Sequence, residues 1–164
     1  MRCCDRDGPC RRTSGPCPQG WQGWHHPVPS PWVALAARPW LSLLYADIPE
    51  PGRYYDAEQC IVLRQGLLRP ERRRVLWHEL VHADRGDVAA HCGRSEEAVV
   101  ERRAVTWALP LRSLRWAFSR EATRHEAAAA LQVPEDWLQF RLDGATDREL
   151  AVLNPLRHSA PEVA

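Results

Sequence analysis

The segment Val75–Ala83 reads VLWHELVHA, and it contains the pattern His-Glu-x-x-His at His78, Glu79 and His82. Two residues four positions apart lie on the same face of a helix, about one turn from each other. Their imidazoles can therefore bind one metal ion, and the motif is typical of zinc sites. Glu79 projects about 100° further round the helix, where it can take a proton from a zinc-bound water. The segment predicts Zn²⁺ held by His78 and His82, with Glu79 as the general base.

The apolar neighbours of the motif argue against two incidental histidines on a surface helix. Leu76, Leu80 and Val81 cover much of the helix circumference, so the helix is expected to be buried. Burying two imidazoles and a carboxylate without partners would cost roughly a few kcal/mol or more. A shared metal ion removes that cost, which favours the metal site.

The helix around the motif has recognisable ends. Pro70 suits its first position, Glu71–Arg85 contains no helix breaker, and Gly86 is a suitable end. Within this stretch Arg72–Arg74 form a run of positive charge, which we interpret as a solvated helix face.

A catalytic zinc site needs a third protein ligand and one open position. The candidates downstream are His91, Glu97 and Glu101, and His91 does not have the spacing of the extended motif that ends in a third histidine. Glu97 and Glu101 lie one turn apart on a second predicted helix, which Ser95 would cap. Compensation of charge at the helix N-terminus explains Glu97 fully, whereas Glu101 lies too deep in the helix for that role. We therefore favour Glu101 as the third ligand, with Glu97 as the alternative.

Short runs of strand-forming residues precede the motif helix. The stretches Trp40–Ile48, Arg53–Asp56 and Gln59–Arg64 predict three strands, with a turn at Pro49–Gly52. We expect an α+β fold of the zincin type, in which a small antiparallel sheet packs on a helical bundle and the metal lies between two helices.

Three or four short helices are predicted after Leu111, with breaks near Ser119, at Val133-Pro134 and at Asp143-Gly144. Within them, residues 126–142 resemble a helix-turn-helix. The second helix of that pair begins with two acids and has only Arg141 for a phosphate contact, so direct nucleic-acid binding is not expected. We interpret the pair as packing on the zincin core.

Composition and segment boundaries suggest how the 164 residues are organised. Residues 1–29 are rich in Pro, Gly, Cys and Arg, and are expected to be disordered or a spurious extension. The zincin-like core is expected over 30–112, a helical C-terminal subdomain over 113–155, and a tail over 156–164. The net charge of +1 provides no global field for nucleic acid or membranes. The absence of a long apolar run predicts a cytoplasmic protein without membrane contact.

Several segments in order resemble the ImmA/IrrE family of metallo-endopeptidases, especially its short phage and actinobacterial members. The strongest is LLRPERRRVLWHELVHADRG at Leu67–Gly86; the others are Pro31–Pro39, Tyr54–Asp56, Ile61–Leu63 and Glu101–Ala104. The resemblance extends from about Pro31 to Leu153. It departs from the family at Arg103, where the glutamate motif often ends in Glu-Ala.

This resemblance implies a zinc endopeptidase that cleaves a repressor-like regulatory protein, typically a helix-turn-helix repressor encoded nearby. Cleavage would relieve repression in a phage or mobile element. The alternative is a non-catalytic, metal-containing regulatory module that binds a repressor or DNA. Glu79 favours the enzyme, because a purely structural metal site needs no general base beside it.

Overall fold

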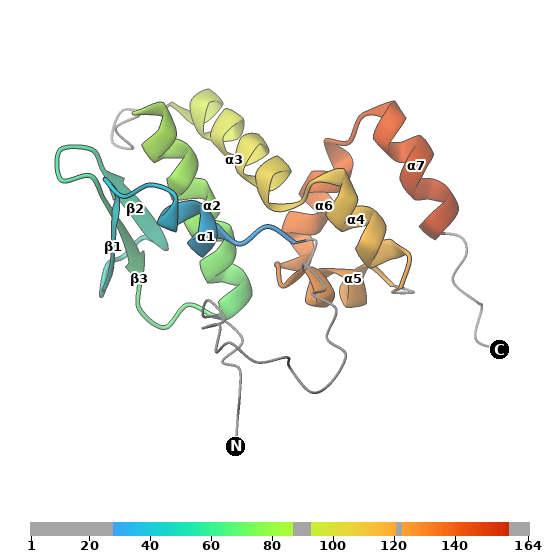
Figure 1. Cartoon of the computed structure of the whole chain (residues 1–164), viewed down its shortest axis with the longest axis horizontal. Helices are drawn as coiled ribbons and strands as arrows, with labels where there is room; N and C mark the ends of the chain where they lie inside the picture. The colour runs from blue at the N-terminus through green and yellow to red at the C-terminus, as the bar shows by residue number, and fades with distance from the viewer. Residues whose placement is uncertain (1–27, 87–92, 121–122, 158–164) are drawn as a thin grey trace, which may run out of the picture.

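The computed structural model describes residues 28–86, 93–120 and 123–157, with side chains up to residue 154. Over these ranges the chain is α+β, with seven helices and one three-stranded sheet (Figure 1). The elements are α1 (Pro31–Ala36), β1 (Ser42–Ala46), β2 (Gly52–Tyr55), β3 (Cys60–Arg64), α2 (Arg69–Arg85), α3 (Arg94–Ala108), α4 (Leu111–Phe118), α5 (Arg124–Leu131), α6 (Glu135–Asp143) and α7 (Asp147–Arg157). Nearly all of the segment 1–29, expected to be disordered or spurious, lies outside the described residues, as does the tail from residue 158.

The sheet is mixed: one of its two pairings is antiparallel, as expected, and the other is parallel. The strand order is β1-β3-β2, with β2 antiparallel and β1 parallel to the central β3. The first four residues of β3 are all buried, whereas both outer strands carry exposed positions. A continuously apolar strand is best buried when it is paired on both sides. The chain therefore turns back after β2 and inserts β3 beside β1.

The helix α2 packs against this sheet; it ends where the sequence predicts and begins one residue before the expected start at Pro70. The carboxylate of Glu71 accepts a hydrogen bond from the backbone N–H of Leu68 at 3.0 Å, and Pro70 lies in the first turn. Gly86 ends the helix with a φ of 67°, a left-handed conformation that favours glycine. Leu76 and Leu80 are fully buried. These contacts hold the His-Glu-x-x-His segment in the interior.

The start of β2 approaches α2 too closely for any residue larger than glycine at position 52. A Cβ atom on Gly52 would overlap Cγ1 of Val75 and would lie 3.0 Å from Cδ2 of Leu63. It would also lie 3.3 Å from Cγ of Glu79. Gly52 thus allows the edge of the sheet to reach the motif helix.

The four C-terminal helices break where the sequence predicts, and they share one hydrophobic cluster with the sheet and α2. In Figure 1, α3 runs from beside α2 towards the group formed by α4–α7. Arg141 of α6 is 4% exposed, donates to the carbonyl of Leu109 at 3.1 Å and pairs with Glu149. Arg141 is therefore engaged inside the protein, and α5 and α6 pack on the shared cluster through residues such as Leu131 and Trp137.

Within the described part of the chain, no helix combines the length and the apolar character that crossing a bilayer requires.

Replacing Gly52 with alanine should lower the free energy of unfolding by about 1–3 kcal/mol, because the added methyl group overpacks the contact with Val75. Chemical denaturation measures the change. Gly144→Ala is the matched control, since its Cβ would meet nothing closer than the Phe140 carbonyl at 3.6 Å. Equal effects of the two substitutions would contradict the close approach of β2 and α2.

Replacing Arg141 with leucine should lower the free energy of unfolding by about 2–4 kcal/mol, because Glu149 and the Leu109 carbonyl lose their partner. The exposed Arg148 lies on the next helix and serves as the control. Arg148→Leu should change the stability by less than about 0.5 kcal/mol. A similarly small change for Arg141→Leu would refute the buried role of Arg141.

Candidate metal centre

His78 and His82 point from the same face of α2 towards Glu97, which reaches them from α3. The Nε2 atoms of the two histidines are 3.1 Å apart. Glu97 places Oε2 at 3.2 Å from Nε2 of His78 and Oε1 at 3.5 Å from Nε2 of His82. Ligands about 2.0–2.1 Å from a tetrahedral zinc ion lie roughly 3.3 Å from one another. The three side chains are therefore close enough together to hold one metal ion.

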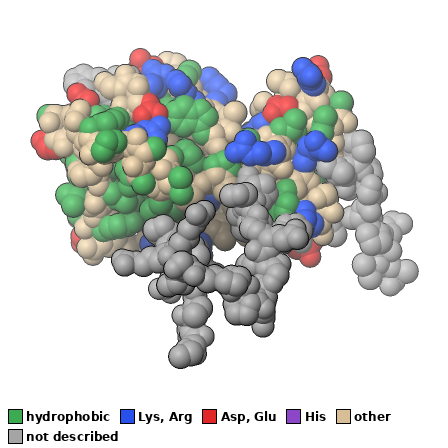
Figure 2. Space-filling view, viewed as in Figure 1, with side chains coloured by type: hydrophobic (Ala, Val, Ile, Leu, Met, Phe, Trp, Pro, Cys, Tyr) green, Lys and Arg blue, Asp and Glu red, His purple; other side chains and the backbone are tan. Residues whose placement is uncertain are grey.

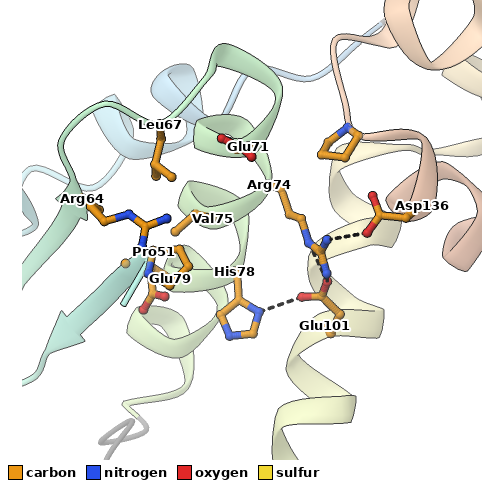
Figure 3. Close-up of a pocket in the computed structure, with 12 residues that line it drawn as sticks. Pro51, Arg64, Leu67, Glu71, Arg74, Val75, His78, Glu79, Glu101 and Asp136 are labelled. Atoms are coloured by element: carbon orange, nitrogen blue, oxygen red, sulfur yellow. Dashed lines mark hydrogen bonds and ion pairs between the residues drawn. The ribbon is translucent and has the colours of Figure 1, made fainter. Parts of the chain in front are cut away.

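Glu101 contacts the other nitrogen of His78. Its Oε2 lies 2.8 Å from Nδ1, the ring atom that points away from the shared Nε2 positions (Figure 3). The hydrogen bonds to His78 and Arg74 lower the pKa of Glu101, although burial acts in the opposite direction. An ionised Glu101 accepts the Nδ1 proton and leaves the lone pair of His78 on Nε2.

The structure therefore groups Glu97, the alternative third ligand, with both histidines, whereas the favoured Glu101 contacts Nδ1 of His78; which carboxylate binds a metal stays a prediction. The interaction with the N-terminus of α3 that was expected of Glu97 is made by Glu96. The helix α3 begins at Arg94, one residue before the expected cap at Ser95, and Glu96 accepts a hydrogen bond from the Gly93 N–H at 2.8 Å. Glu97 is thus free to face the histidines. His91 lies outside the described residues.

Glu79 is 5% exposed and lies beside the two histidines. The backbone N–H of Tyr54 in β2 donates to its carboxylate, while Oε2 has no hydrogen-bond partner. Burial raises the pKa of Glu79 to about 7, against the opposing effects of His78 and the Tyr54 N–H. The carboxyl group can therefore gain and lose a proton near neutral pH, as a general base must.

The centre favours positive charge. Burial alone would lower the pKa of His78, yet its hydrogen bond to Glu101 and the nearby charges of Glu79 and Glu97 raise that pKa above its usual value. Carboxylates that stabilise an imidazolium would also stabilise a divalent cation in the same place. The donor set, two imidazoles and a carboxylate, is one that Zn²⁺ accepts in catalytic sites.

A cleft of about 550 Å³ gives access to the centre, and both His78 and Glu79 line it. One wall is formed by Pro51 and Gly52 at the start of β2, and the opposite wall includes Asp136 at the start of α6 (Figure 3). His82, which is 1% exposed, does not line the cleft. A molecule in the cleft would therefore meet His78 and Glu79 first.

Two residues around the centre were not predicted from the sequence as part of it. Arg74 was interpreted as one of three solvated arginines, but it bonds to Glu101 and to Asp136. Arg73 of the same run is 5% exposed and donates to the carbonyl of Pro29 at 2.7 Å, so the run is not a solvated face. Arg74 lies one turn before His78, which is a usable sequence signal, whereas nothing local indicates Asp136.

No protein-family model, curated protein or solved structure matches the chain. The chemistry of the centre is accordingly inferred from its own side chains.

Replacing Glu97 with glutamine should weaken Zn²⁺ binding by more than about 100-fold, because the centre loses its charged third ligand. Competition with a chromophoric chelator measures the dissociation constant. Glu101→Gln should cost less, about 10–100-fold, as expected of a residue that orients a ligand. Glu96→Gln is the matched control and should change the affinity by less than about threefold. A larger loss for Glu101→Gln than for Glu97→Gln would contradict the assignment.

Proposed function

We propose that the chain is a zinc-dependent endopeptidase of the ImmA/IrrE type. The observation that carries the proposal is the mutual spacing of His78, His82 and Glu97 beside the buried, partly unpaired carboxylate of Glu79. Polar groups that are buried without hydrogen-bond partners are costly, so they are retained where chemistry needs them.

Three protein ligands would leave one position of a tetrahedral ion open, which is the arrangement of catalytic rather than structural zinc sites. Zn²⁺ bound there would supply an acidified water and an electrophile for the carbonyl of the scissile peptide bond. The cleft gives such a peptide access to this position along the side that His78 and Glu79 line. The coordination and the access together favour hydrolysis over a purely structural role.

Glu79 would perform the proton transfers. Its carboxylate takes a proton from the attacking water and returns that proton to the leaving amine. Glu79 is therefore ionised again at the end of the cycle. The Tyr54 N–H orients one side of the carboxylate, and Oε2 remains available for the water. Burial of Glu79 excludes bulk solvent from the exchanged proton.

The substrate would be an extended segment of a protein. Binding as an added strand is one way for a sheet edge to hold a peptide. Pro51 and Gly52 of the β2 edge line the cleft, but the N–H of Tyr54 is already engaged by Glu79. Pairing with the substrate would therefore use the beginning of β2. That the protein cleaved is a helix-turn-helix repressor of a phage or mobile element rests on the family resemblance alone.

Replacing Glu79 with glutamine should reduce kcat by about 10²–10⁴-fold, the usual contribution of a general base, because the amide cannot accept the proton. Zinc-loaded, full-length protein is incubated with a peptide library from a digested proteome, and the products are read by mass spectrometry. Zinc affinity should stay within about threefold of the native value, as should that of the control Glu96→Gln. Equal cleavage by Glu79→Gln and native protein would overturn the assigned role.

The repressor assignment has its own readout. Native protein, co-expressed with the repressor encoded beside its gene, should deplete that repressor, and Glu79→Gln should not. Equal repressor levels in both cultures would favour the non-catalytic binding module.

A further inference from the structure

Arg74 lies between two carboxylates that come from distant parts of the chain. Its Nε and Nη2 atoms are 3.1 and 2.8 Å from Oε1 of Glu101 on α3. Its Nη1 atom is 3.0 Å from Oδ2 of Asp136 on α6. Figure 3 shows the guanidinium between these two groups, with Glu101 also facing His78. One side chain of α2 thereby links α3 and α6.

The network continues from Arg74 to the metal centre through Glu101. Each oxygen of that carboxylate has a different partner: Oε1 accepts from Arg74, and Oε2 lies 2.8 Å from Nδ1 of His78. A carboxylate held at both oxygens cannot rotate without breaking a bond. Its bond to Nδ1 sets the orientation of the imidazole whose Nε2 faces His82 and Glu97.

Exposure decreases along the network towards the metal centre. The side chain of Asp136 is 72% exposed, that of Arg74 38%, and that of Glu101 18%. Exposed ion pairs contribute little to stability, whereas hydrogen bonds between charged groups strengthen as water is excluded. The contact between Arg74 and Glu101 should therefore matter most, and the contact with Asp136 less.

We propose that Arg74 is a positioning residue of the metal centre, and that Asp136 makes α6 part of the same network. Arg74 holds Glu101, and Glu101 holds His78 with Nδ1 as donor and Nε2 as the ligand atom. The planar fork of arginine suits this task, because it can contact two carboxylates at fixed angles. The inference rests on the proposed metal site and extends it to the C-terminal helices.

A purely structural ion pair between α2, α3 and α6 would affect the stability of the protein but not the imidazole of His78. The test therefore reads His78 directly. The ¹⁵N NMR shifts of its ring in metal-free, full-length protein report which nitrogen carries the proton. Zn²⁺ affinity, measured by chelator competition on the same samples, reports the consequence for the site.

Arg74→Met should shift the His78 ring away from the form protonated on Nδ1 and weaken Zn²⁺ binding by about 10–100-fold, the usual cost of losing an orienting partner. Arg72→Met is the matched control: it removes an arginine of the same helix, whose guanidinium contacts the Leu67 carbonyl and the ring of Tyr45. It should leave the His78 spectrum unchanged and the affinity within about threefold.

Asp136→Asn keeps the inference testable if Arg74→Met fails to fold, because Asp136 is mostly exposed. It should weaken Zn²⁺ binding about three- to tenfold. Its control, Glu135→Gln, removes the same charge from the same helix end, where Glu135 contacts Arg124 and His125 instead. That control should have no effect on affinity.

Separate outcomes refute the zinc site and the positioning role of Arg74. If the native protein binds no Zn²⁺, the proposed function falls, while the NMR comparison still tests the positioning of His78. If Arg74→Met matches Arg72→Met in both the His78 spectrum and the Zn²⁺ affinity, the positioning role is overturned and the proposed function stands.

Discussion

The packing of α3 against α2 is the contact on which the candidate centre depends. Two histidines one turn apart define only one side of a metal site, and the carboxylate of Glu97 must come from another element. Val100, Ala104 and Ala108 of α3 are all fully buried, and the two small side chains among them allow a close helix approach. A shift of α3 by one turn, about 5.4 Å, would bring Glu101 to the place of Glu97 beside the two histidines.

The centre gathers charge that folding alone would avoid. The carboxylates of Glu79, Glu97 and Glu101 surround His78, and repulsion among them adds to the cost of their burial. Arg74 offsets part of this charge from one side, and a proton or a divalent ion would offset the rest from the other. Such local conflict with stability is common at functional sites. Oε2 of Glu79, a buried oxygen without a hydrogen-bond partner, lies within this group of charges.

The sequence predicted those features that depend on neighbouring residues. The motif helix, its proline start and its glycine end are local signals, and the structure has them where they were expected. The strands were predicted, but their pairing was not. The position of β3 between β1 and β2 decides the strand order, and this position depends on the packing of the whole sheet. Depth along a helix did not distinguish Glu97 from Glu101, since only packing determines that Glu97 reaches Nε2 of both histidines and Glu101 reaches Nδ1 of His78. The hydrogen bond between Arg74 and Asp136 joins residues 62 positions apart, and no local sequence pattern indicates it.

Zinc K-edge X-ray absorption on the full-length protein, loaded with one equivalent of Zn²⁺, tests the central claim most directly. The account predicts a four-coordinate ion with two imidazoles and oxygen ligands at about 2.0–2.1 Å. It also predicts that the imidazole signature disappears when His78 and His82 are both replaced by alanine. A native protein that retains no zinc, or whose spectrum shows only a shell of oxygens without imidazole, would contradict it.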